Sequence, residues 1–126
     1  MKFAIWGVSF KPGTNDVRGS VSIYIINQII KFGGKVSAYD PHAIENIKKI
    51  YKNKKNIIFE NEKYTATNNS NALILLTEWP EFRCPNFNVL KTKLINPVIF
   101  DGRNQFNKYE LKKLGFEYYQ IGSPLL

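Results

Sequence analysis

The chain has 126 residues, a typical single-domain length, and it is 44% hydrophobic and 14% aromatic, which excludes a disordered tail and allows a real core. Lysine and arginine number 18 against 10 acidic residues, and the formal net charge of +8 suits a polyanionic partner, whether a nucleotide, a nucleic acid or a membrane surface. No apolar stretch approaches the roughly 20 residues of a membrane span, no signal peptide is expected, and Cys84, the single cysteine, excludes an intrachain disulfide, so we expect a cytoplasmic protein.

The first half of the chain is predicted to alternate between strand and helix. Apolar runs, helical spacing of isoleucines and glycine or proline stop signals give these elements in order: strand Phe3–Val8, helix Val21–Phe32, strand Lys35–Tyr39, helix Ala43–Tyr51, strand Asn56–Glu60 and a short helix within Lys63–Asn71. The lysine-rich end of the second helix and the residues after it are interpreted as a solvated surface, because no aromatic residues interleave with the lysines as a base-stacking groove requires.

The second half of the chain continues the alternation. The predicted elements are strand Ala72–Thr77, loop Trp79–Asn88, helix Val89–Leu94, strand Pro97–Phe100, helix Lys108–Leu114, strand Phe116–Ile121 and a tail from Ser123 to Leu126. Strands that alternate with helices predict a single α/β domain over residues 1–126, a Rossmann-like three-layer sandwich with a mostly parallel sheet.

Ligands of open α/β sheets bind beyond the carboxyl ends of the strands. At the first of these predicted ends, Lys11 and Arg18 lie in a loop before Ser20, which can cap the following helix, so this stretch is a candidate anion site. Arg103 follows a later strand and offers a planar fork for a phosphate. Two alternatives stay open: Arg103 pairs with Asp101 or Asp40, and Lys11 is an ordinary exposed lysine.

The first loop lacks the glycine patterns of nucleotide-binding motifs. It contains neither G-x-G-x-x-G nor G-x-x-x-x-G-K-[ST], since Gly7 and Gly13 are too far apart for the first and Lys11 is misplaced for the second. A Rossmann-like fold therefore does not by itself imply that this chain binds NAD on its own.

Five segments together resemble one enzyme family. In chain order they are WGVSFKPGTNDVR (6–18), AYDP (38–41), LTEWPEF (76–82), FDGRN (100–104) and GFEYYQIG (115–122). Their identity and order are similar to the C-terminal, UDP-binding domain of the UDP-glucose/GDP-mannose dehydrogenase family, and in particular to its UDP-glucose 6-dehydrogenases. The resemblance covers nearly the whole chain.

The resemblance implies a role for four residues. Phe10 and Lys11 match the pair that contacts the UDP-sugar, Arg103 matches an arginine that contacts the substrate, and Arg18 matches an arginine near the nicotinamide cofactor held by another domain. Gly19 departs from the family pattern, in which an acidic residue often follows the Arg18 position. Ser123 departs as well, because a basic residue commonly stands there.

The resemblance also implies what this chain lacks. In the family, oxidation of the UDP-glucose primary alcohol to UDP-glucuronate uses NAD, an N-terminal dinucleotide-binding domain, a central helix and a catalytic cysteine in a glycine-rich loop. Cys84, in Phe82–Asn86, has no glycine beside it and does not match that nucleophile. We therefore expect no catalytic residue, no resident cofactor and no metal site, and no dehydrogenase activity from the chain alone.

Several other residues receive structural interpretations. Trp79, Phe82, Tyr118 and Tyr119 are expected to pack rather than to stack on a base. His42 follows Pro41 at a helix start, with no catalytic motif around it, and is expected to have a surface or capping role.

Three hypotheses from different classes remain at this point. The chain is the UDP-sugar-binding part of a dehydrogenase, whose partners are UDP-glucose or a related UDP-sugar and the remaining domains. Alternatively, it is a non-catalytic stand-alone remnant that binds nucleotide sugars or a full-length relative. A nucleic-acid binder ranks last, and we expect neither nucleic acid nor membrane as a partner. UDP-N-acetylhexosamine stays open as the sugar nucleotide.

Overall fold

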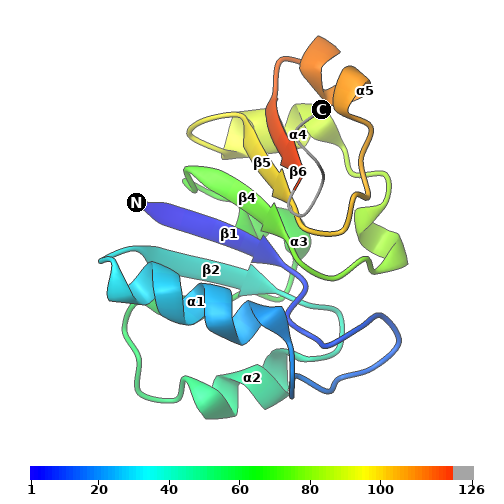
Figure 1. The fold of residues 1–126 in the computed structure, drawn as a ribbon. Coiled ribbons are helices and arrows are strands. Elements are labelled where there is room, and N and C mark those ends of the chain that lie inside the picture. The colour runs from blue at the N-terminus through cyan, green and yellow to red at the C-terminus, as the bar shows by residue number, and fades with distance from the viewer. Residues whose placement is uncertain (121–126) are drawn as a thin grey trace.

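The computed structural model describes residues 1–120 and contains one six-stranded, all-parallel sheet (Figure 1). The strands are β1 (Lys2–Trp6), β2 (Lys35–Tyr39), β3 (Ile57–Phe59), β4 (Ala72–Leu75), β5 (Val98–Asp101) and β6 (Glu117–Gln120). The helices are α1 (Val21–Lys31), α2 (Ile44–Ile50), α3 (Lys63–Ala66), the short 3-10 helix η1 (Pro80–Phe82), α4 (Phe87–Lys93) and α5 (Lys108–Lys113). The strand order is β3-β2-β1-β4-β5-β6, so the predicted Rossmann-like α/β fold is confirmed.

Alternation along the central strands produces two apolar cores. Ala4 and Trp6 of β1 face a cluster that includes Leu90 of α4 and Leu111 of α5, whereas Ile5 faces a cluster with Ile26 of α1. Figure 1 shows α1 and α2 beside the β1–β3 half of the sheet, and α4 and α5 beside the β5–β6 half. The three predicted layers are therefore present.

The ends of α1 follow from single residues. Ser20 has an extended backbone and its side chain accepts a hydrogen bond from the Ser22 amide, which is the capping arrangement that the sequence predicts. Gly33 has φ of 85°, in the left-handed region, and its amide donates to the carbonyl of Ile30. Ser22 also donates from its hydroxyl to the Val8 carbonyl at 2.9 Å, which ties the start of α1 to the end of β1.

The main deviation from the prediction lies in the segment assigned as the loop Trp79–Asn88. Residues Pro80–Phe82 form η1, and α4 begins at Phe87 rather than at Val89. Asn86 caps α4 with its side-chain oxygen, which accepts from the amides of residues 88 and 89. The other element boundaries agree with the prediction to within a few residues, and the predicted tail Ser123–Leu126 lies outside the described residues.

Candidate functional site

The site predicted at the carboxyl edge of the sheet is centred on the ends of β1 and β4. These neighbouring strands lead into connections on opposite faces of the sheet, so their ends diverge. Gly7 stands at this point with φ of 92°, and a Cβ added to it would lie 2.5 Å from the Thr77 Cβ. Only glycine allows β1 and the segment after β4 to approach so closely. The hydroxyl of Thr77 donates to the carbonyl of Ser9 at 2.8 Å, which joins the two ends.

Asp40, at the end of β2, holds the residues that lead into the first loop. Its side chain is 2% exposed, and its Oδ2 accepts from the amides of Val8 at 2.8 Å and Ser9 at 3.0 Å and from the indole N–H of Trp79 at 3.1 Å. Its Oδ1 accepts from two further amides, those of residues 42 and 43, each at 2.9 Å. A buried carboxylate that accepts five hydrogen bonds holds the surrounding backbone in place. Both of its oxygens are already bound to protein groups, so it is not available to a ligand.

The loop after β1 presents Phe10 and Lys11 outward. The Phe10 amide donates to the carbonyl of Asp16 at 2.6 Å, which closes the loop, while the Phe10 ring is 48% exposed. The Lys11 side chain is exposed and has no hydrogen-bond or ion-pair partner among residues 1–120. The carbonyl of Asn15 accepts from the Asn46 side chain of α2 at 2.7 Å, so the far side of the loop is anchored as well.

Arg18 lies farther along the same loop and points into solvent. Its side chain is 90% exposed, and its Nε and Nη2 donate to the two carboxylate oxygens of Asp16, each at 3.1 Å. These hydrogen bonds hold the pKa of Asp16 below its ordinary value. The arrangement keeps the guanidinium extended at the surface, where a group from outside this domain can reach it.

A second buried carboxylate, Asp101, organises the end of β5. It is 0% exposed, its Oδ1 accepts from the amide of Arg103, and its Oδ2 accepts from the hydroxyl of Tyr118 at 2.6 Å. Oδ2 also accepts from the amides of residues 105 and 106 at 2.7 and 2.9 Å. Asp101 therefore fixes the turn that carries Arg103, much as Asp40 fixes the entry to the loop that carries Lys11.

The Arg103 side chain pairs with Glu78 rather than with either aspartate considered in the sequence analysis. Its Nε donates to the carbonyl of Leu76 at 2.8 Å and lies 3.3 Å from Glu78 Oε2. Both side chains of the pair are about one third exposed, at 37% and 34%. Within the described part of the chain, no hydrogen bond engages the terminal Nη nitrogens of Arg103. The contacts of Nε orient the guanidinium group, and its two Nη nitrogens can donate to an anion.

The aromatic residues mostly have the packing roles that were predicted. Trp79 and Phe82 are 7% and 0% exposed, and Tyr118 is partly buried against the same core. Tyr119 differs, because it stacks on another aromatic ring but stays 49% exposed. The ring of His42 is exposed and stacks on Trp79 with centroids 4.9 Å apart, which agrees with a surface role.

Cys84 is exposed in the segment between η1 and α4. Within residues 1–120, no group of three histidine, cysteine, aspartate or glutamate side chains is arranged to hold a metal ion. The same residues contain no helix that is both long and apolar enough to cross a bilayer.

The carboxyl edge carries three cations, Lys11, Arg18 and Arg103, of which Arg18 pairs with Asp16 and Arg103 with Glu78. Lys11 and the Nη nitrogens of Arg103 are the groups there that can contact an anionic ligand.

Comparison with known proteins identifies the family. The UDP binding domain of the UDP-glucose/GDP-mannose dehydrogenase family matches residues 4–108. The chain belongs to this family. It is 37% identical over 123 residues to the UDP-glucose 6-dehydrogenase of Rhizobium meliloti strain 1021, and 34% identical over 124 residues to that of Pseudomonas aeruginosa. These alignments cover 98% and 96% of this chain but 28% and 27% of the relatives, so the chain spans little more than a quarter of their length and corresponds to their C-terminal, UDP-binding domain.

Solved structures of the family share the fold. An NDP-N-acetyl-D-galactosaminuronic acid dehydrogenase from Methanosarcina mazei superposes with a TM-score of 0.79 at 25% identity, over 96% of this chain and 24% of that one. A UDP-glucose dehydrogenase from Pyrobaculum islandicum gives a TM-score of 0.75 at 20% identity, over 94% of this chain and 24% of its own. The resemblance inferred from the five sequence segments is therefore confirmed, for both family and fold.

Proposed function

We propose that this UDP-binding domain holds the UDP-sugar of an NAD-dependent UDP-glucose 6-dehydrogenase, with Phe10, Lys11 and Arg103 as its substrate-binding residues. The observation that carries the proposal is the placement of Lys11 and Arg103 in a chain of this family. Both lie beyond the carboxyl edge of the sheet, after strands β1 and β5, which β4 separates. At about 4.8 Å per strand, the two strand ends lie roughly 10 Å apart, a distance that a diphosphate with its sugar can bridge.

The contacts of the two cations support complementary roles. Lys11 is a mobile point charge with no partner in residues 1–120, so a phosphate competes with no protein carboxylate for it. Arg103 is held through Nε and offers its Nη nitrogens, which suits a bidentate contact to a phosphate or to a sugar hydroxyl. Phe10, half-exposed and next to Lys11 in the loop, supplies an apolar surface for the ligand.

Oxidation of the sugar alcohol requires NAD, which we assign to the part of the full-length enzyme outside this chain. Dinucleotide-binding sheets use an acidic residue after the second strand to hold a ribose hydroxyl. The acidic residue at that place here is Asp40, whose two oxygens already accept five hydrogen bonds from protein groups. Arg18, exposed on the outer part of the first loop, is proposed to reach the cofactor held by the other domain.

Calorimetric titration of the purified chain with UDP-glucose tests the assignment. Loss of a charged hydrogen-bonding group costs about 1.5–3 kcal/mol, so Lys11→Ala and Arg103→Ala are each expected to weaken binding by about tenfold or more. Lys54→Ala is the matched control, since it removes an exposed lysine far from the carboxyl edge and leaves affinity unchanged. Equal affinity of wild type and both site variants, or no binding by folded wild type, would contradict the assignment.

A parallel titration with UDP-N-acetylglucosamine tests the choice of sugar, and UDP-glucose is expected to bind at least as tightly.

The purified chain is also expected to form no NADH from UDP-glucose and NAD. Measurable NADH formation by the chain alone would show that catalysis does not depend on other domains.

A further inference from the structure

Three carboxylates lie at or just beyond the ends of β2, β4 and β5, and protein donors occupy them to different extents. Asp40 accepts five hydrogen bonds, and Asp101 accepts one through Oδ1 and three through Oδ2. Glu78, after β4, accepts none among residues 1–120, although its side chain is only 34% exposed. Its Oε2 lies 3.3 Å from Nε of Arg103, but that N–H donates to the carbonyl of Leu76. The acceptor positions of the Glu78 carboxylate are therefore open to a donor from outside the chain.

The backbone on both sides of Glu78 is held in place. The hydroxyl of Thr77 donates to the Ser9 carbonyl at 2.8 Å. The indole N–H of Trp79 donates to the Ser9 hydroxyl and to Asp40 Oδ2, at 3.1 Å each. Thr77 and Trp79 are 0% and 7% exposed, so Glu78 is a partly exposed residue between two buried ones. Its carboxylate is thus presented to solvent from a fixed segment.

The position of Glu78 restricts which part of a nucleotide sugar can contact it. Because β4 lies between β1 and β5, Glu78 stands between the strand ends that lead to Lys11 and Arg103. A phosphate is an anion with acceptor oxygens, so a carboxylate repels it. The N3–H of uracil lies between two carbonyl oxygens, which a carboxylate also repels. The hydroxyls of ribose and glucose are neutral donors, and they suit this carboxylate.

We propose that Glu78 accepts a hydrogen bond from a sugar hydroxyl of the bound nucleotide sugar, and that it is a specificity-determining residue of the site. This inference rests on the proposed function. A hydroxyl can donate to Glu78 while it accepts from a guanidinium N–H, so Glu78 and the Nη nitrogens of Arg103 form a matched acceptor and donor. Lys11 has no carboxylate partner among residues 1–120 and remains for the diphosphate.

The pair also disfavours ligands that lack the hydroxyl. The Glu78 carboxylate offsets part of the positive charge of Arg103, so a phosphate gains less there than it would from an unpaired arginine. A site that is built to bind a hydroxyl rejects an analogue without it, because the protein groups are then left unpaired. Glu78 therefore favours a nucleotide sugar over a plain phosphate compound of the same charge.

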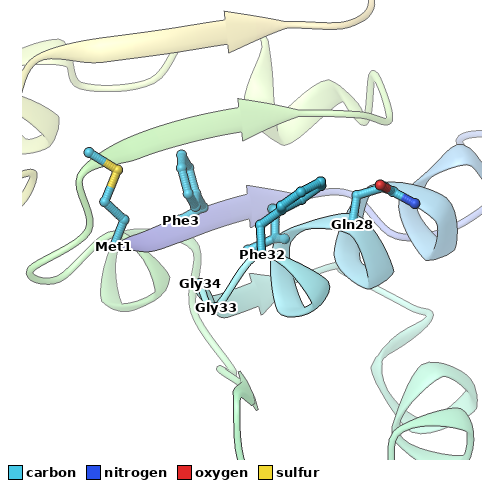
Figure 2. Close-up of a pocket in the computed structure, with 7 residues that line it drawn as sticks. Met1, Phe3, Gln28, Phe32, Gly33 and Gly34 are labelled. Atoms are coloured by element: carbon cyan, nitrogen blue, oxygen red, sulfur yellow. The ribbon is translucent and has the colours of Figure 1, made fainter.

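An apolar hollow at the opposite edge of the sheet offers no comparable chemistry. It measures about 440 Å³ and lies at the amino end of β1, lined chiefly by Met1, Phe3, Gln28, Ile29 and Phe32. Figure 2 shows the rings of Phe3 and Phe32 there, with Gln28 as the polar side chain. None of these side chains is charged, so the hollow offers no side-chain cation to a diphosphate.

Calorimetric titration with three ligands tests the role of Glu78: UDP-glucose, UDP and 2′,3′-dideoxy-UDP, which has no sugar hydroxyl. Glu78→Gln and Glu78→Ala are compared with wild type. UDP-glucose is expected to bind about fivefold more weakly to the glutamine variant and about tenfold or more weakly to the alanine variant. Dideoxy-UDP is expected to bind as tightly as to wild type or more tightly, because Arg103 loses its carboxylate partner.

Titration with UDP distinguishes the two sources of the hydroxyl. Weaker binding of both UDP and UDP-glucose by the variants identifies a ribose hydroxyl. Weaker binding of UDP-glucose alone identifies a glucose hydroxyl, and either result supports the proposal. Because Glu78 accepts no hydrogen bond from residues 1–120, both variants are expected to fold, and a urea midpoint near that of wild type checks this.

Two results would overturn the proposal. Unchanged or tighter binding of UDP-glucose by both variants means that no hydroxyl contacts Glu78. Equal weakening of all three ligands, dideoxy-UDP included, means that Glu78 acts only by orienting Arg103. Glu110→Gln, which removes the same charge from an exposed residue of α5, is the matched control and is expected to leave all three affinities unchanged. No binding of UDP-glucose by folded wild type would instead contradict the proposed function, and this inference with it.

Discussion

Replacement of Asp40 by asparagine tests the idea that one buried carboxylate fixes the binding loop. Oδ2 accepts three hydrogen bonds and Oδ1 two, all from N–H donors at 2.8–3.1 Å. Asparagine keeps the shape of the side chain but replaces one acceptor oxygen by an NH₂ group. In the less damaging orientation, the NH₂ group faces the amides of His42 and Ala43, and those two donors lose their acceptor.

The expected loss of stability follows from this count. Hydrogen bonds to a charged group contribute about 1.5–3 kcal/mol each, so two lost bonds correspond to about 3–6 kcal/mol. The free energy of unfolding of a domain is typically about 5–15 kcal/mol, so Asp40→Asn removes a large fraction of it. With a urea dependence of about 2 kcal/mol per molar, the unfolding midpoint is expected to fall by about 1.5–3 M.

Urea denaturation followed by tryptophan fluorescence measures this change, since Trp6 and Trp79 are both buried. Asp16→Asn is the matched control, because it makes the same chemical change at a carboxylate that pairs with Arg18 at the surface, and its midpoint is expected to match wild type. A midpoint shift of less than about 0.5 M for Asp40→Asn would refute the reasoning, because it would mean that the amides of His42 and Ala43 lose their charged acceptor almost without cost.

Three further changes test other parts of the fold. Gly7→Ala is expected to prevent stable folding, because its φ is 92° and the new Cβ would lie 2.5 Å from the Thr77 Cβ; a cooperative urea transition near that of wild type would contradict this. Phe82→Ala, at a side chain with 0% exposure that stacks on an indole ring, is expected to cost about 3–5 kcal/mol in the same denaturation assay. Burial, with a neighbouring carboxylate in each case, raises the pKa of Tyr39 and Tyr118 in the folded protein, so the stability they contribute is complete below about pH 10 and is lost as the pH rises above it. Thermal melts between pH 8 and pH 11.5 are expected to show this decline and a shallower one in Tyr118→Phe.

The fold was predictable because its signals are local. Each strand is a short run rich in apolar residues, and α1 begins and ends at residues whose side chain or φ sets the boundary, Ser20 and Gly33. The start of α4 was missed although it also has a local signal, since Asn86 precedes the helix as its cap. Pro85 favoured a loop assignment. It precedes the cap residue, however, and a proline before a helix does not prevent the helix from starting.

The contacts of the site residues were less predictable, because they depend on the order of the strands. Glu78 and Arg103 are 25 positions apart in sequence and meet because β4 and β5 are neighbours in the sheet. Asp40 was one of the partners considered for Arg103, yet β2 lies three strands away from β5, and its carboxylate is occupied by the loop after β1. Parallel pairing between distant segments, which propensity and spacing do not encode, decides both outcomes.

The two buried aspartates explain how a Rossmann-like sheet can suit a nucleotide sugar without a dinucleotide motif. A glycine-rich loop presents free backbone amides to a pyrophosphate. Here the amides of Val8 and Ser9 are bound by Asp40, so the protein's own carboxylate stands where a ligand anion is bound in that motif. Recognition of an anion at this edge then depends on side chains, and the cations placed there are Lys11 and Arg103. Because a side-chain cation on a loop contacts a phosphate from one side only, two cations from different strand ends can hold a diphosphate more firmly than either can alone.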